Sequence, residues 1–165
     1  MTPARLIATG FGLGLLPRAP GTWGALGALP AGWILHGLGG FPLLAGATVA
    51  AFLAGLWAVA RETRPGGASD PPEFVIDEIA GQWVALWPLS GGLWWMGADP
   101  WLFPWPGWLG AFALFRLFDI LKPPPVGWAD RLGTPLGVML DDLIAGIMAA
   151  GIVILGAAVA HGWLA

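Results

Sequence analysis

Phe115-Arg116-Leu117-Phe118-Asp119-Ile120-Leu121-Lys122-Pro123-Pro124-Pro125 places three charged residues at the end of an apolar run. The charges recur at every third residue, and this spacing keeps side chains on one slowly drifting face of a helix. The prolines then end the helix, because proline lacks an amide hydrogen and disfavours helical geometry in the residue before it. The stretch therefore predicts a helix whose last turn presents Arg116, Asp119 and Lys122 together.

Two other stretches place a pair of carboxylates at the start of an apolar run. Asp77-Glu78 precedes Ile79-Ala80-Gly81, and Asp141-Asp142 precedes Leu143-Ile144-Ala145-Gly146. Both contain the pattern Asp-x-Ile-Ala-Gly, which fits two helices that approach each other through Gly81 and Gly146 or an old internal duplication. Because the rest of the chain is so poor in charge, we expect the three charged stretches to meet.

The composition indicates an integral membrane protein. The chain has 165 residues, of which 57% are hydrophobic and only 10% charged, and its mean hydropathy is +0.74. An unusually apolar soluble helical protein is the alternative, but ordinary soluble domains carry about 25% charged residues. Twelve tryptophans without a tyrosine fit aromatic anchors at the membrane surface. We predict one membrane-embedded domain over residues 1–165, an all-α polytopic helical bundle.

Two compositional features exclude whole classes of function. The net charge of −3 argues against a nucleic-acid partner, which requires a basic surface. The absence of cysteine excludes disulfides, thiolate-bound zinc and a cysteine nucleophile.

The apolar segments predict about four to five membrane spans, some of them short or re-entrant. A span needs roughly 20 apolar residues, and the candidates are residues 24–38, 41–60, 79–97, 101–121 and 143–164. The first two resemble a helical hairpin that turns at the glycines of residues 37–40, and residues 126–136 are expected to form a loop. Small residues recur at every fourth position of the second segment, which predicts close helix packing along Gly46, Ala50, Ala54 and Ala58.

With five spans and a cytoplasmic N-terminus, all basic residues fall on one side of the membrane. The positive-inside rule makes that side cytoplasmic, and the residues concerned are Arg5, Arg18, Arg61, Arg64, Arg116, Lys122 and Arg131. The same arrangement places the acidic pairs on the cytoplasmic face and leaves His36, Asp99 and His161 on the other.

A group of carboxylates at the edge of a bilayer indicates a bound cation. The acids repel one another and are costly to dehydrate, so a cation is needed to neutralise them. Oxygen ligands without cysteine favour Mg²⁺ first and Mn²⁺ second, and the candidate ligands are Asp77, Glu78, Asp141 and Asp142. The alternative without a metal is that the acids compensate helix dipoles while Arg116 and Asp119 form a salt bridge within one helix.

The glycine- and proline-rich segment of residues 10–24 has two interpretations. Its Gly-x-Gly pattern follows no strand and precedes no Gly-Lys-Ser/Thr, which excludes Rossmann and P-loop nucleotide sites. It is either a plain interfacial loop or an anion-binding loop in which Arg18 and Thr22 donate to phosphate oxygens.

Cations beside a metal cluster are what phosphoryl chemistry requires, since catalysis there is mostly positioning and charge neutralisation. We predict metal-assisted hydrolysis of a phosphate monoester, with Arg18, Thr22, Arg116 and Lys122 as phosphate-binding residues. A carboxylate would activate water or attack the phosphorus itself, and the sequence does not choose between these routes. The candidate catalytic carboxylates are Asp77, Asp119 and Asp142.

Four motifs, in order along the chain, resemble the phosphatidylglycerophosphatase A family. The resemblance runs from about residue 11 to residue 146 and rests on Leu16-Pro17-Arg18-Ala19-Pro20-Gly21-Thr22-Trp23-Gly24, Ile76-Asp77-Glu78-Ile79-Ala80-Gly81-Gln82-Trp83, Phe115-Arg116-Leu117-Phe118-Asp119-Ile120-Leu121-Lys122-Pro123 and Gly137-Val138-Met139-Leu140-Asp141-Asp142-Leu143-Ile144-Ala145-Gly146. It implies an all-helical, Mg²⁺-dependent lipid phosphatase of the bacterial inner membrane, whose site faces the cytoplasm. Such an enzyme removes the terminal phosphate of phosphatidylglycerophosphate and yields phosphatidylglycerol and inorganic phosphate for phospholipid biosynthesis.

The matching positions of these motifs are the polar residues already singled out, together with Pro20 and Gly21. One departure is Thr134-Pro135, where the family tends to have a Gly-Gly step, and this weakens a phosphate-binding role for the backbone of that loop. The main alternative function is a membrane transporter or channel with an acidic cation-binding cluster, although its charges would be expected near span centres. A scaffold subunit and a phosphotransferase acting on nucleotide-activated lipids are the remaining alternatives.

Overall fold

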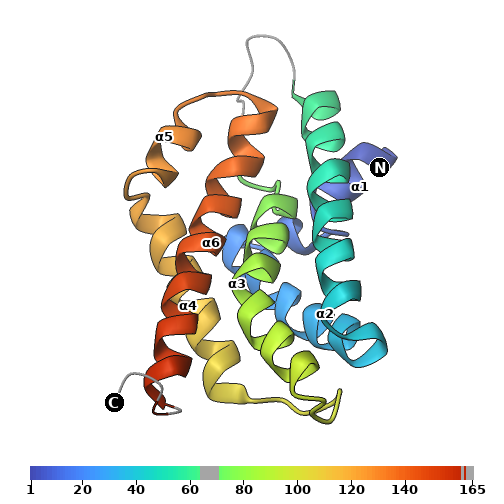
Figure 1. Cartoon of the computed structure of the whole chain (residues 1–165). Helices are drawn as coiled ribbons and strands as arrows, with labels where there is room; N and C mark the ends of the chain where they lie inside the picture. Colours follow the sequence, from blue (N-terminus) through green and yellow to red (C-terminus); the bar gives the residue numbers. More distant parts are fainter. Residues whose placement is uncertain (64–70, 161, 163–165) are drawn as a thin grey trace.

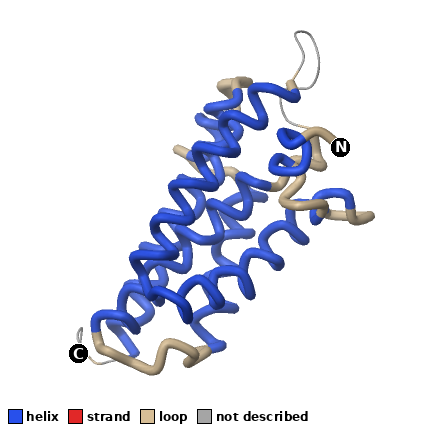
Figure 2. The backbone as a smooth tube through the Cα atoms, turned by 90° about the vertical axis from the view of Figure 1, so that its right-hand side faces the viewer, coloured by secondary structure: helices blue, strands red, loops and turns tan. Residues whose placement is uncertain are grey.

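Helices and short turns make up the part of the chain that the computed structural model describes, residues 1–63, 71–160 and 162. Figure 2 shows no strand in this part, which confirms the all-helical prediction. The predicted positions of Arg64, His161 and the end of the last span lie outside the described residues. In chain order the elements are α1 (Pro3–Ala8), the 3₁₀ turn η1 (Leu13–Leu15), α2 (Pro20–Glu62), α3 (Ile76–Trp95), α4 (Trp105–Leu121), α5 (Val126–Asp130) and α6 (Pro135–Ala160).

The long element α2 is a hairpin of two helices. It has 43 residues, which as one straight helix would extend about 65 Å, twice the hydrocarbon core of roughly 30 Å. Gly39 and Gly40 leave helical geometry, and Gly40 has a φ of 64°, in the left-handed region that favours glycine. The chain reverses there (Figure 1), so that Gly24 and Gly55 both contact the residues that begin α3. The predicted hairpin and its turn are confirmed.

Helix α3 packs between α2 and α6 and approaches α6 through two glycines (Figure 1). A Cβ atom on Gly81 would lie 2.5 Å from the carbonyl oxygen of Asp142, and one on Gly146 would lie 2.3 Å from the carbonyl oxygen of Gly81. Side chains at these positions would force the helices apart. The contact predicted from the shared Asp-x-Ile-Ala-Gly pattern is therefore confirmed.

Helix α6 starts earlier than the predicted last span. It begins at Pro135, and the hydroxyl of Thr134 accepts a hydrogen bond of 3.1 Å from the amide of Gly137. Threonine before a helix and proline in its first turn are favourable for helix initiation, so the Thr134-Pro135 step starts the helix. Asp141 and Asp142 consequently lie in its second turn, not at its start. The expected loop of residues 126–136 also contains the short helix α5.

Apolar side chains both fill the interior and cover much of the surface. Trp108, Phe115 and Leu86 are fully buried, whereas long apolar side chains of α2, α4 and α6 are exposed. Two helices, α2 and α6, are long and apolar enough to cross a membrane, yet only 28% and 17% of their most apolar windows are buried. Core helices of soluble proteins bury most of their apolar residues, so this distribution supports association with a membrane.

The small-residue stripe of α2 does not pack as predicted. Of its members, Ala58 is buried, but Ala50 is exposed and a Cβ atom on Gly46 would meet nothing within 4 Å. The close contact of this helix runs through Gly55, where an added Cβ atom would lie 2.7 Å from the side chain of Met139. The prediction of close packing along the whole stripe is therefore wrong, because the packed face of the helix is the neighbouring one.

Candidate active site

The first turn of α3 places Asp77 and Glu78 at one end of the bundle. The amide of Val75 donates a hydrogen bond of 2.8 Å to the carbonyl oxygen of Ala8, which ties the start of α3 to the end of α1. Acidic side chains are favoured in the first turn of a helix by the partial positive charge of its amide groups. The local sequence thus fixes both carboxylates at the N-terminus of α3.

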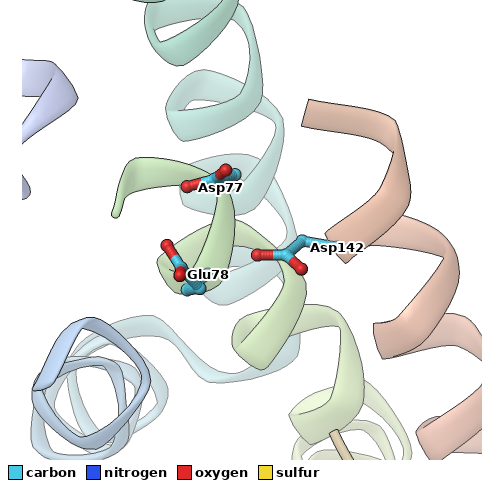
Figure 3. A group of neighbouring side chains, drawn as sticks. All are labelled: Asp77, Glu78 and Asp142. Carbon is cyan, nitrogen blue, oxygen red and sulfur yellow. The ribbon is translucent and has the colours of Figure 1, made fainter. Parts of the chain in front are cut away.

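Asp142, from the second turn of α6, meets these two carboxylates. One carboxylate oxygen from each of Asp77, Glu78 and Asp142 lies within 4.8 Å of the others. Figure 3 shows the carboxylate of Asp142 pointing from α6 toward the first turn of α3, where Asp77 and Glu78 lie. Asp77 and Asp142 are only 5% and 3% exposed. The structure therefore brings three of the predicted metal ligands together in a buried acidic cluster.

Arg116 and Asp119, from the last turns of α4, flank this acidic cluster. Nη1 of Arg116 lies 3.9 Å from Oε1 of Glu78 and donates a hydrogen bond to Asp119. The charge of Asp119 in turn acts on both Glu78 and Asp142. Four carboxylates against one guanidinium leave a formal charge of −3, which is costly away from water unless a cation binds.

The acidic cluster suits a hard divalent cation. All of its donor atoms are carboxylate oxygens, the ligand type that Mg²⁺, Mn²⁺ and Ca²⁺ prefer, whereas zinc favours nitrogen and sulfur. Mg²⁺ in proteins is held by one or two carboxylates together with water and substrate phosphate. The three carboxylates are therefore able to hold a metal ion, and Asp77, Glu78 and Asp142 are the residues that would do so.

Lys122 connects α4 to α5 and α6. The chain leaves α4 through this residue in a left-handed conformation, and Nζ of Lys122 donates a hydrogen bond of 2.6 Å to Oδ2 of Asp141 and another to Asp130. Burial lowers the pKa of Lys122, but the hydrogen bonds and charges of the two aspartates outweigh this effect and raise the pKa above its usual range. Asp141 is thus paired with Lys122 and is not one of the three carboxylates that meet.

The start of α2 lies against the same cluster. A Cβ atom on Gly21 would lie 2.0 Å from Oε1 of Glu78 and 3.2 Å from Nη1 of Arg116, so a side chain at this position would displace both. Thr22 follows in the first turn of α2 and is half-buried. Arg18, in the turn before α2, is exposed and forms no ion pair within the described part of the chain.

Two further polar residues of the site region had no role in the sequence analysis. Gln82, one turn after Glu78 on α3, is fully buried, and neither atom of its side-chain amide has a hydrogen-bond partner among the described residues. Its spacing of four residues from Glu78 places it on the same side of the helix, and this spacing could have identified Gln82 from the sequence. Asp130 was visible only as a charge in a predicted loop, because its pairing with Lys122 depends on α5.

The fold and site together define a class, an all-helical protein of membrane character with a carboxylate cluster beside an arginine at one end. Phosphate-ester enzymes that use a divalent cation combine these groups. The chain matches the phosphatidylglycerophosphatase A family over residues 6–157.

Individual relatives agree with the family match. The chain is 38% identical to phosphatidylglycerophosphatase A of Haemophilus influenzae over 154 residues, 93% of this chain and 88% of that protein. It is 32% identical to phosphatidylglycerophosphatase A of Escherichia coli over 163 residues, 98% and 86% of the two chains. A Bacteroides thetaiotaomicron protein, 38% identical over 148 residues and covered to 86% in both chains, has a name that refers to phosphatidylinositol-3-phosphatase.

No solved structure matches the chain. The protein belongs to the phosphatidylglycerophosphatase A family and is a phosphoric monoester hydrolase.

Proposed function

We propose that this protein is a Mg²⁺-dependent, multi-pass membrane phosphatase that converts phosphatidylglycerophosphate to phosphatidylglycerol and inorganic phosphate in phospholipid biosynthesis. The observation that carries the proposal is the meeting of Asp77, Glu78 and Asp142 beside Arg116, in a chain of this family. A carboxylate cluster that only stabilised the fold would be expected to be neutralised by its own cations, and here Arg116 pairs with Glu78 and Asp119 beside three carboxylates that meet.

The phosphate group is held by the cationic and donor groups next to the acids. Arg116 presents its guanidinium to the oxygens of the phosphoryl group, and Asp119 fixes the orientation of that guanidinium through their hydrogen bond. The glycine at position 21 lets the first turn of α2 come close, so that its amides and the hydroxyl of Thr22 donate to the same oxygens. Arg18 and Lys122 add positive charge at the rim of the site.

Hydrolysis exchanges one bond to phosphorus for another. Asp77, Glu78 and Asp142, with Asp141 nearby, would hold a divalent cation, which when bound would supply Lewis-acid polarisation of the phosphoryl group and a more acidic water. A carboxylate among Asp77, Asp119 and Asp142 accepts the proton of the attacking water, whose oxygen bonds to phosphorus. The bond from phosphorus to the glycerol oxygen breaks, and that oxygen takes up a proton to become the hydroxyl of the product. An aspartate that attacks phosphorus directly would give the same products.

We further propose a bacterial inner-membrane location of four to five spans with the site on the cytoplasmic side. The described basic residues all belong to the end of the bundle that carries the acids, namely Arg5, Arg18, Arg61, Arg116, Lys122 and Arg131. Positive charge concentrates on the cytoplasmic side of membrane proteins. The two halves of α2, together with α3, α4 and α6, supply five helical segments for the spans.

The experiment is phosphate release by the purified protein in detergent micelles, with Mg²⁺ and after its removal by a chelator. Phosphatidylglycerophosphate and phosphatidylinositol 3-phosphate are compared as substrates, because the name of one relative refers to the second headgroup. Mg²⁺-dependent release that is faster from phosphatidylglycerophosphate supports the proposal. Faster release from the inositol lipid would change the substrate, and no release from either lipid by folded protein would contradict the phosphatase function.

A further inference from the structure

An apolar groove of about 650 Å³ lies beside the acidic cluster, between the α1 and η1 segment, both halves of α2 and the start of α3. Every residue that lines it is apolar or glycine. Its one side-chain polar group, the indole N–H of Trp83, donates a hydrogen bond of 2.8 Å to the carbonyl oxygen of Ala28 and is satisfied. A ligand in this groove therefore needs no polar groups along its length.

The groove and the acidic cluster both involve the first turn of α3. Ile76 and Ile79 line it and flank Asp77 and Glu78 on either side along α3. On α2 the groove begins at Gly27, six residues after Gly21, whose Cα lies against Glu78 and Arg116. The start of the groove and the acidic cluster therefore lie at the same end of the bundle.

From the first turn of α3 the groove runs along α2 toward the opposite end of the molecule. Its lining on the first half of α2 extends from Gly27 to Leu35, an axial distance of about 12 Å. On the second half it extends from Ala54 back to Ala47, antiparallel to the first. The element α2, to which both stretches belong, contains a window apolar enough to cross a membrane. The groove therefore leads from the charged end into the depth that lipid hydrocarbon occupies.

The small residues of α2 create this space. Ala47, Ala50 and Ala54 form one wall, and their short side chains leave room where longer ones would contact Ile79 and Trp83. Ala50 and Ala54 belong to the stripe that fails to pack against another helix. The small size of residues that pack against no other helix and face no polar partner is explained if a mobile, apolar ligand occupies the space beside them.

We propose that this groove binds one fatty acyl chain of the phospholipid substrate while the phosphate lies at the acidic cluster. The inference rests on the proposed function and adds a site for the hydrocarbon part of the substrate. A peptide segment is a poor occupant, because the groove offers nothing for its backbone amides and carbonyls to bind. The surrounding bilayer is as apolar as the groove, so moving an acyl chain into the groove adds little hydrophobic affinity. Binding there instead positions the substrate and selects its acyl chain.

Filling the groove tests the inference. Ala47→Phe and Ala50→Phe place an aromatic ring in it, and Val49→Phe, on the same helix but outside the groove and already 54% exposed, is the matched control. Phosphate release is measured in micelles from phosphatidylglycerophosphate with two oleoyl chains and with two hexanoyl chains. We expect the groove variants to lower kcat/KM for the oleoyl substrate about tenfold and to leave the hexanoyl substrate and the Val49→Phe control unchanged. Equal losses for both chain lengths, or no loss for either, would overturn the inference.

Photocrosslinking gives a readout that does not depend on hydrolysis. The probes are phosphatidic acid and phosphatidylcholine that carry a diazirine in one acyl chain, with attachment sites mapped by mass spectrometry. We expect phosphatidic acid to label the groove residues more strongly, and the Ala50→Phe substitution to abolish that labelling. Equal labelling by both lipids would show that bulk lipid fills the groove and would refute the inference. If the wild-type protein is labelled as expected but releases phosphate from neither the oleoyl nor the hexanoyl substrate, the proposed function is refuted while the proposed acyl-chain binding in the groove is supported.

Discussion

The two ends of the bundle both bury polar side chains, but they differ in how those side chains are paired. At the end opposite the acids, His36 and Ser90 are buried and share a hydrogen bond of 2.7 Å, and Asp99 accepts one of 2.9 Å from the amide of Trp101. Each of these polar groups has a partner. At the acidic end the carboxylates of Asp77, Glu78 and Asp142 meet, and Arg116 forms ion pairs with Glu78 and Asp119. An excess of buried charge, rather than burial itself, distinguishes the site from a structural contact.

Substitutions that remove a carboxylate charge should affect the rate of phosphate release far more at the acidic end than at the opposite end, and this is the largest difference we expect. We expect Asp77→Asn and Asp142→Asn to lower phosphate release by about 10³-fold, because each removes a charged ligand oxygen from the acidic cluster. Asp99→Asn, at the opposite end, should leave the rate unchanged. The rates are measured at saturating Mg²⁺ on variants whose elution volume and circular dichroism match the wild type. A folded Asp142→Asn variant with near wild-type activity would contradict the role assigned to the acidic cluster.

Glycine-to-alanine substitutions compare a packed position of α3, Gly81, with an unpacked one, Gly92. Gly81→Ala should lower the free energy of unfolding by about 1–3 kcal/mol, since the new Cβ atom would meet the backbone of Asp142 at 2.5 Å. Gly92→Ala, where an added Cβ atom would meet nothing within 4 Å, should be neutral or stabilise the helix by up to about 1 kcal/mol. Thermal unfolding in detergent measures both. Equal effects of the two substitutions would refute the close contact of α3 with α6.

Lys122 forms two ion pairs at the acidic end, a buried one with Asp141 and an exposed one with Asp130, and their energies should differ. Double-mutant cycles that combine Lys122→Gln with Asp141→Asn or Asp130→Asn give the two coupling energies. We expect about 1–2 kcal/mol for Asp141, whose side chain is 7% exposed, and less than about 1 kcal/mol for Asp130, at 41% exposed. The opposite order would show that Asp130 is the main partner. A rise in KM without loss of stability in Lys122→Gln would favour direct phosphate binding.

The smallest effect is expected from the polar pair at the opposite end. Ser90→Ala removes the partner of His36 and should cost about 1 kcal/mol of unfolding free energy without changing the rate of phosphate release. Ser90→Thr, which keeps the hydroxyl, is the conservative comparison. A large loss of activity in folded Ser90→Ala would mean that the two ends are coupled.

The sequence predicted those features that depend on local chemistry. The proline run after Lys122, the glycine turn of α2 and the shared pattern around Gly81 and Gly146 each specify backbone geometry through the residues themselves. The meeting of Asp77, Glu78 and Asp142 followed from charge alone, because so few charges are present that they have few other places to lie. The all-helical structure followed from the apolar composition and segment lengths, and the family from the four sequence motifs.

The remaining features depend on distances between segments that are far apart in the chain. The separation of Asp141 from the acidic cluster arises because Lys122 pairs with it. Lys122 also donates a hydrogen bond to Asp130 at the end of α5, which was expected to be loop. The start of α6 was misplaced because apolar content was given more weight than the Thr134-Pro135 step. The stripe of α2 was assigned to helix packing because spacing alone does not show whether a small residue faces a helix or a space.

The close approach of α3 and α6 also constrains how the protein is made. Asp142 follows Asp77 by 65 residues and belongs to α6, which leaves the ribosome after α3. Until that helix is inserted and Gly146 packs on Gly81, the nascent chain holds only part of its acidic cluster. The acidic cluster is therefore complete only after α6 has inserted, and a chain truncated before α6 would lack the carboxylate of Asp142 however well its earlier helices insert.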